Sequence, residues 1–304
     1  MRTGHSCGLV EKVSGYRCRW IFVLEAMALL LTVVPLRAQD PLTQNSAQGT
    51  NNPQQGSAPN DEELAKDVKN PFADLIQVQI GNDFGFGGDT GNRLQYAMTL
   101  QPIIPIKIND SWDLVTRTNF SVSSIPESDS GSSRITGASD LTTEFYFSPE
   151  KKTPFIWGFG PVLEIPTASD VALGSGKWAL GPAFGIIKQT EHWTYGGVAY
   201  HVWSFAGDKN RDKVSSTYLQ PVLYYSWGDG WTVGVDVEST YDSMAPNGNR
   251  WTVPVQPSIS KVTNWGRQSV SLSLGVVAYA VAPAGSPMAA INLTIAPLFP
   301  RRGR

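Results

Sequence analysis

After residue 71 the chain alternates apolar and polar residues with a period of two. In the stretch 231–238, Trp and Val occupy the odd positions, whereas the even positions are polar or small and include Asp236 and Glu238. The stretches 138–148 and 269–279 show the same pattern. An apolar face opposite a polar face is typical of a half-buried β-strand. No comparable helical period follows residue 71, so the pattern predicts an all-β fold.

About twelve such segments follow one another, and most of them are about eleven residues long. A strand needs roughly 9–11 residues, tilted, to cross the hydrocarbon core of a membrane. The connections between the segments alternate between short and long, as in outer-membrane barrels. We therefore predict one antiparallel transmembrane β-barrel of about 12 strands within residues 71–304. The predicted strands are 72–83, 94–108, 111–125, 138–148, 154–165, 178–188, 193–203, 217–227, 231–241, 251–262, 269–279 and 288–299.

The tryptophans lie near the ends of the predicted strands. One group follows or borders short connections, and the other borders long loops; the first includes Trp112, Trp193 and Trp231, the second Trp178, Trp203 and Trp251. Two belts of amphipathic rings are expected where strands cross two membrane interfaces. A soluble β-sandwich is the alternative, with the same rings in its core, but a sandwich does not require aromatic residues at both ends of its strands.

The cost of exposing charge to lipid sets the predicted orientation of the strands. A charged side chain on the lipid face costs up to about 2–4 kcal/mol at the middle of the bilayer. Asp236 and Glu238 share one strand face, so we expect both to point into the lumen. The same alternation predicts a polar and ionic interior and an exterior of Val, Leu, Ile, Phe and Trp. The candidate lumen-lining and selectivity residues are Asp236, Glu238, Glu144, Glu164, Arg117 and Asp113, accompanied by Asn119, Gln95 and Gln101.

The N-terminal part of the chain reads as two further segments. In residues 1–38, basic residues precede a short apolar run and a small residue, which predicts a cleaved signal peptide. An uncleaved anchor helix is the alternative, although the run is shorter than the ~20 residues that a spanning helix needs. Residues 39–70 read as a flexible periplasmic segment, rich at first in Gln, Asn, Gly, Ser and Pro. Within that segment, a short helix is expected from Asp61 to Lys69.

Composition narrows the classes of function. Charged residues make up only 16% of the chain, below the roughly 25% of soluble domains, yet the mean hydropathy is only −0.17. Removal of residues 1–38 removes both cysteines and leaves 19 basic and 24 acidic residues, a net charge of −5. No polycation for nucleic acid is present. Without cysteine, and with only His192 and His201, the chain is not expected to hold zinc or iron or to need a cofactor.

Three groups of residues resemble parts of enzyme sites. His201 and Ser204 suggest a serine hydrolase, but on a strand these two residues point to opposite faces. Glu144 and Glu164 on adjacent strands suggest a glycosidase pair, although inward acidic pairs are more common in pores. The Gly-rich stretch 81–88 lacks the Lys-Ser/Thr and the helix of a phosphate-binding loop. We therefore expect no enzyme. Asp236 and Glu238, opposed by Arg117 across the lumen, form either a selective constriction or a structural salt-bridge network.

A series of short motifs recurs in order between residues 62 and 299. They are ELAK at 63–66, NP at 70–71, QPIIP at 101–105, DSWDLVTRT at 110–118, FSP at 147–149, WGFGP at 157–161, GKW at 176–178, GP at 181–182, WTYG at 193–196, HVWS at 201–204, LQP at 219–221 and STY at 239–241. Together they resemble the outer-membrane transporter-like family related to the MetA-pathway phenol-degradation protein, often labelled "transporter" or mislabelled neuromedin U. The resemblance implies a barrel that small, including aromatic, compounds cross, and it implies no catalytic residues.

These observations predict passive passage of small solutes through an outer-membrane barrel. An acidic lumen would favour cations or polar neutral solutes over anions. The alternative is a closed barrel with a structural or surface ligand-binding role. The expected partners are outer-membrane lipids, a small-molecule solute and the barrel assembly machinery, since Phe299 on the last strand resembles an assembly signal; no nucleic acid is expected.

Overall fold

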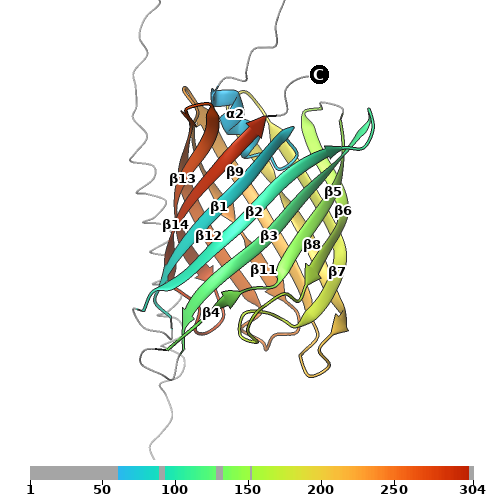
Figure 1. Ribbon diagram of the computed structural model, residues 1–304, viewed down its shortest axis with the longest axis vertical. Helices are drawn as coiled ribbons and strands as arrows, with labels where there is room; N and C mark the ends of the chain where they lie inside the picture. The colour runs from blue at the N-terminus through green and yellow to red at the C-terminus, as the bar shows by residue number, and fades with distance from the viewer. Residues whose placement is uncertain (1–60, 89–92, 128–132, 151–152, 301–304) are drawn as a thin grey trace, which may run out of the picture.

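The computed structural model describes residues 61–88, 93–127, 133–150 and 153–300, which form a short helix and a closed antiparallel β-barrel (Figure 1). The predicted signal peptide, residues 1–38, and the predicted flexible stretch up to residue 60 lie outside the described residues. The elements are α2 (Asp61–Val68), β1 (Leu75–Phe86), β2 (Gln95–Lys107), β3 (Trp112–Pro126), β4 (Arg134–Ala138), β5 (Leu141–Pro149), β6 (Phe155–Ile165), β7 (Lys177–Gln189), β8 (Trp193–Gly207), β9 (Ser215–Trp227), β10 (Trp231–Val237), β11 (Ser239–Asp242), β12 (Trp251–Trp265), β13 (Gln268–Val281) and β14 (Ala289–Pro300).

The 14 strands make 12 spans of the barrel because two of the spans are interrupted. Strands β4 and β5 pair with successive parts of β3, and the break between them lies at residues 139–140. Strands β10 and β11 both lie between β9 and β12, and only Glu238 separates them. Each of the twelve predicted segments falls on one of the spans, so the predicted fold class is confirmed.

Pairing between the first and last strands closes the barrel. Strand β1 runs antiparallel to β14, from Leu75 opposite Pro300 to Phe86 opposite Ala289. An even number of antiparallel spans brings the two ends of the barrel sequence to the same end of the barrel. That end carries the short turns, at the top of Figure 1, and the long loops lie at the other end. Closure leaves neither the first nor the last span with an unpaired edge, whereas β4 pairs with β3 alone.

The outer surface of the barrel is apolar, as the alternation predicts. Along β7, Leu180, Phe184 and Ile186 are exposed, whereas their alternate neighbours Ala183 and Ile187 are buried. The exposed tryptophans lie at both ends of the strands, and they are Trp178, Trp193, Trp203, Trp231, Trp251 and Trp265. An outer face of this kind suits contact with hydrocarbon and two interfaces.

Helix α2 lies inside the mouth of the barrel at the short-turn end (Figure 1). Its first turn is acidic, which complements the positive end of the helix dipole, and Asn70 ends the turn that follows the helix by accepting a hydrogen bond from the backbone N–H of Phe72. The buried face of α2, Leu64, Ala65 and Val68, packs with wall residues of β1, β12 and β14. None of the described helices is long and apolar enough to cross a membrane.

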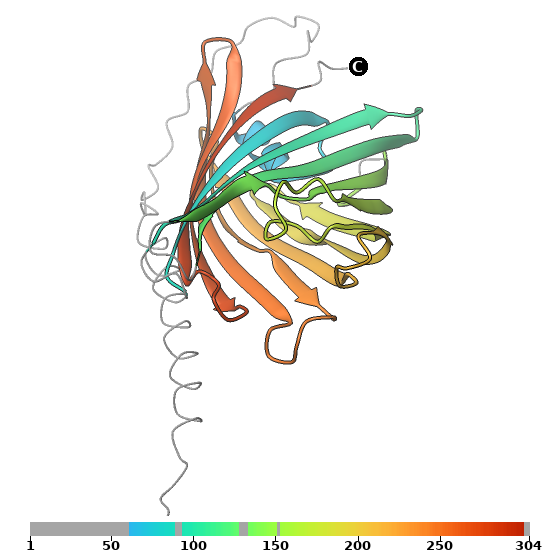
Figure 2. The same ribbon diagram turned by 60° about the horizontal axis from the view of Figure 1, so that its bottom comes forward.

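Part of the interior differs from the polar lumen that we expected. On the β2–β8 side, an apolar cluster fills the space inside the wall, and Phe72 from the connection after α2 packs against it. Figure 2 shows the barrel from nearer its long-loop end. Wall glycines leave room for this ring, because a Cβ at Gly158 would lie 2.8 Å, and one at Gly185 2.5 Å, from atoms of Phe72. Phe72 also contacts Tyr146 edge to face. The cluster contains Ile103, Val115, Tyr146, Val162, Ala179, Ala183, Val198 and Val202.

Candidate functional site: the polar cavity of the lumen

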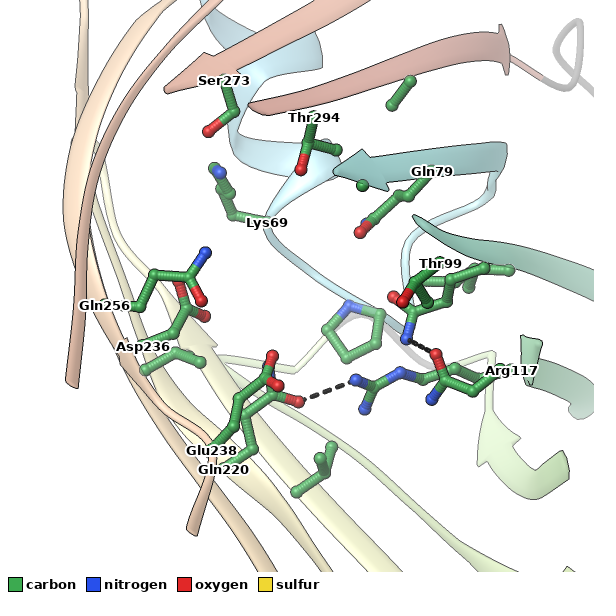
Figure 3. Close-up of a pocket in the computed structure, with 18 of the residues that line it drawn as sticks. Lys69, Gln79, Thr99, Arg117, Gln220, Asp236, Glu238, Gln256, Ser273 and Thr294 are labelled. Carbon is green, nitrogen blue, oxygen red and sulfur yellow. Dashed lines mark hydrogen bonds between the residues drawn. The ribbon is translucent and has the colours of Figure 1, made fainter. Parts of the chain in front are cut away.

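A polar cavity of about 380 Å³ occupies the part of the lumen that the apolar cluster leaves open (Figure 3). Its walls come from β1, β2, β3, β7, β8, β9, β10, β12, β13 and β14. Helix α2 contributes Val68, and the connection after it contributes Lys69 and Pro71. Amide and hydroxyl side chains dominate the lining. The labelled examples in Figure 3 are Gln79, Thr99, Gln220, Gln256, Ser273 and Thr294.

Arg117 ties two sides of the lumen together. The Arg117 guanidinium donates a 2.9 Å hydrogen bond to Oε1 of Gln220 on β9, and its Nη1 lies 3.6 Å from a carboxylate oxygen of Glu144 on β5. Glu144, opposite Arg117 in the β3–β5 ladder, is only 1% exposed and also accepts a hydrogen bond from the hydroxyl of Tyr146. The charge of Arg117 is therefore largely compensated within the wall.

Asp236 and Glu238 both line the cavity. Asp236 accepts a hydrogen bond from the hydroxyl of Tyr224, and Glu238 accepts one of 3.2 Å from the amide of Gln220. We expected Arg117 to face these carboxylates across the lumen. In the structure Gln220 stands between Arg117 and Glu238, donating to one and accepting from the other (Figure 3).

The other predicted residues lie outside the cavity lining. Glu144 lies behind Arg117 in the wall. Glu164 is placed diagonally to Glu144, since Glu144 pairs with Val162 and Glu164 with Thr142, but it lies toward the long-loop end of β6. Asp113 lies at the short-turn end of β3. Of the six residues named from the sequence, the cavity thus brings together Arg117, Asp236 and Glu238.

Several functional residues were missed by the sequence reasoning. The glutamines at positions 79, 220 and 256 could have been found, because each alternates with apolar neighbours and so lies on the polar face of its own predicted strand. Lys69 could not have been found in this way. It lies in the connection between a helix and a strand, where no periodic pattern indicates the direction of a side chain. Its ammonium lies 4.8 Å from the centroid of the Tyr224 ring. Asp83 on β1 also lines the cavity and accepts a hydrogen bond from Asn292.

The charged groups of the lining leave the cavity acidic. Asp83, Asp236 and Glu238 face two cations, Lys69 and Arg117, and Glu144 already compensates Arg117. In the described part of the chain, no group of three or more His, Cys, Asp or Glu side chains is arranged to hold a metal ion.

His201 lies on the opposite, outer face of the wall, beside the exposed Trp203. The ring nitrogens of His201 contact hydroxyls on β9, with Thr217 at 2.7 Å from Nδ1 and Ser215 at 3.4 Å from Nε2. The Ser215 contact was missed from the sequence because it depends on strand register. A carboxylate, which orients the histidine in a serine hydrolase triad, is replaced here by the hydroxyl of Thr217.

The barrel and its polar lumen define a fold of the outer-membrane channel type. Among solved structures, an outer membrane channel from Pseudomonas putida F1 matches with a TM-score of 0.56 at 15% identity, covering 74% of this chain and 94% of that one. A bacterial polysaccharide outer membrane secretin (TM-score 0.35, 10% identity, 75% and 99% covered) and a BenF-like porin from Pseudomonas fluorescens Pf-5 (0.28, 6%, 74% and 97%) are too distant to carry an argument. No family model and no curated protein matches the sequence. These comparisons establish the fold alone.

Proposed function

We propose that the protein is an outer-membrane channel through which small solutes cross passively, with cations and polar neutral molecules preferred over anions. The observation that carries the proposal is the acidic, amide-lined cavity inside a closed barrel whose outer surface is apolar. The likeness of the fold to an outer membrane channel supports it. Export through a cleaved signal peptide, 1–38, is part of the same proposal.

The lining suggests how a solute would cross. Amide and hydroxyl groups replace the hydrogen bonds that a solute loses with its water, and carboxylates attract cations, which is how pores select among solutes. Such passage needs no cofactor. The rings of Tyr200 and Tyr218, stacked with centroids 4.8 Å apart, add a flat aromatic surface to the cavity wall. This pair supports the inclusion of small aromatic compounds among the solutes.

One observation favours a second candidate, a closed barrel with a structural or surface ligand-binding role. Helix α2 packs into the mouth at the short-turn end and narrows it. If α2 never leaves this place, the long loops at the other end become the functional part of the molecule.

Single-channel recording separates the two candidates. The purified full chain is inserted into a planar bilayer, and its fold is checked by the shift in electrophoretic mobility on heating. Reproducible conductance steps, with a reversal potential in a salt gradient that reports cation preference, support the channel. Silence from a folded preparation, together with ligand binding that depends on the long loops, supports the closed barrel.

A further inference from the structure

The side chain of Lys69 reaches into the cavity from the connection between α2 and β1 (Figure 3). Its ammonium nitrogen lies 4.8 Å from the centroid of the Tyr224 ring, within the distance at which a cation is attracted to an aromatic face. Asp236, which lines the same part of the cavity, accepts a hydrogen bond from the Tyr224 hydroxyl. An ammonium ion of the chain itself therefore lies over an aromatic face whose hydroxyl is hydrogen-bonded to a carboxylate.

The wall is built to present the face of the Tyr224 ring. Gly234 lies directly opposite Tyr224 in the β9–β10 ladder, and a Cβ at that position would clash with Tyr224 Cδ1 and with the carbonyl oxygen of Leu223. The missing side chain lets the ring lie against the wall. The hydrogen bond from its hydroxyl to Asp236 then holds it there, and the negative carboxylate makes the ring a better partner for a cation.

We propose that the Tyr224–Asp236 subsite binds small solutes that carry a primary ammonium group, and that Lys69 is a tethered stand-in which such a solute displaces. The proposal rests on the proposed function, because it names the solute class that the channel recognises. An ammonium offers three donors and a full positive charge, which match a carboxylate, an aromatic face and nearby amide oxygens. Gln256, opposite Asp236 on β12, supplies one such amide.

The size and lining of the rest of the cavity indicate the chemistry of the solute's body, that is, the part other than its ammonium group. A volume of about 380 Å³ is at the lower end of the range for small-molecule pockets. Hydroxyls of Thr99, Ser273 and Thr294 suit a hydroxylated body, and the stacked Tyr200 and Tyr218 suit a flat ring. The class is therefore a small primary amine with a hydroxylated or aromatic body.

Lys69 is suited to act as a displaceable occupant. Burial within the barrel lowers the pKa of its ammonium, and the negative charge of Asp236 opposes that shift only in part. Release into water restores the hydration that burial removes, so exchange for another ammonium is not opposed by the desolvation of Lys69. A tethered competitor also reduces the apparent affinity of the solute, because the solute can bind only during the fraction of time in which Lys69 has left the subsite.

The test compares tyramine with its neutral analogue 4-(2-hydroxyethyl)phenol, which carries a hydroxyl in place of the ammonium. Isothermal titration of the full chain in detergent is done on the wild type, Lys69→Met and Lys69→Met/Asp236→Asn, each checked for folding by heat-dependent mobility. We expect Lys69→Met to bind tyramine about tenfold more tightly than the wild type, since the competitor is gone. The double variant is expected to lose this gain and also corrects for partition of tyramine into detergent.

The neutral analogue should bind all three proteins equally weakly. Equal affinity of the wild type and Lys69→Met for tyramine, or tight binding that survives Asp236→Asn, overturns the proposal, as does equal binding of the two probes by Lys69→Met. Conductance of the same variants tests the proposed channel function separately from the ammonium subsite. Conductance steps without tyramine discrimination reject the ammonium subsite and keep the channel, whereas discrimination without conductance keeps the subsite and rejects the channel.

Discussion

The guanidinium of Arg117 lies 3.6 Å from the carboxylate of Glu144 on the neighbouring strand, and the side chains are only 6% and 1% exposed. This pair neutralises a cation within the barrel wall, so the charge of the open lumen depends on Asp83, Asp236 and Glu238 against Lys69. The charge pair in the wall and the carboxylates that face the cavity are two different elements, and Gln220 joins them by accepting from Arg117 and donating to Glu238.

Removing one member of the Arg117–Glu144 pair should destabilise the barrel. We expect Glu144→Gln to lower the free energy of unfolding by about 3–5 kcal/mol, because it leaves the Arg117 charge buried without its partner. Urea unfolding in lipid vesicles, followed by tryptophan fluorescence, measures the change. Arg117→Met/Glu144→Leu, which removes both charges, should recover a large part of the loss. Wild-type stability of Glu144→Gln would show that the pair does not brace the wall.

Neutralising the cavity carboxylates should change ion selectivity. Each carboxylate contributes on the order of 1 kcal/mol to a cation a few ångströms away in a wet lumen, which corresponds to about a fivefold effect. We therefore expect Asp236→Asn/Glu238→Gln to shift the reversal potential in a potassium chloride gradient toward that of chloride. Asp110→Asn in the exposed β2–β3 turn is the matched control and should leave it unchanged. An unchanged potential in the double variant would reject the acidic lumen as the selectivity element.

Releasing α2 from the mouth should enlarge the pore. Leu64 is 3% exposed within the cluster that holds the helix. Leu64→Asp removes this packing, which costs about 2–5 kcal/mol for a buried leucine truncated to alanine, and also places a carboxylate among apolar groups. We expect larger conductance steps and faster swelling of liposomes in sugar solutions. Glu63→Gln, on the exposed side of the helix, should behave as the wild type. If proteolysis shows a released α2 and conductance is unaltered, the helix does not limit passage.

A side chain at Gly234 should disturb the Tyr224 ring. Gly234→Ala places a methyl group against that ring and against a neighbouring carbonyl oxygen. Overpacking of this kind costs about 1–3 kcal/mol, so we expect a lower unfolding midpoint in urea. At Gly85, another strand glycine, the nearest atoms to an added Cβ are 3.5 Å away, which is an ordinary contact, and Gly85→Ala should change the midpoint little. Equal midpoints for the two variants would mean that the close approach at Gly234 is not required.

Most of the barrel could be predicted because its signal is local. Period-two alternation over 231–241 locates a strand and assigns Asp236 and Glu238 to one face, and the structure has both in the cavity lining. The interruption at Glu238 was not predicted, since the alternation of apolar and polar residues leads up to it without a visible break. The apolar cluster around Phe72 was also missed, because small wall residues such as Gly158 carry no sign of what fills the space in front of them.

The candidate site was predicted only as far as strand faces allow. Arg117 and Glu144 are both assigned to the lumen by parity, but their contact depends on the register of β3 and β5. Gln220 reaches Arg117 across the lumen, which depends on closure of the sheet into a barrel of this width. A serine at 215 within reach of His201 likewise depends on register between β8 and β9.

Local alternation, segment length and the spacing of turns thus predict a barrel of about twelve spans, its apolar exterior and the face of most strand residues. The exceptions lie where the register shifts, in the β7–β8 and β12–β13 ladders. Register, closure of β1 on β14, and the docking of α2 with Lys69 over Tyr224 come only from the folded molecule. The physical reason is that a period of two specifies which side of a strand a residue occupies, whereas its neighbours are set by hydrogen-bond ladders and packing between segments far apart in the chain.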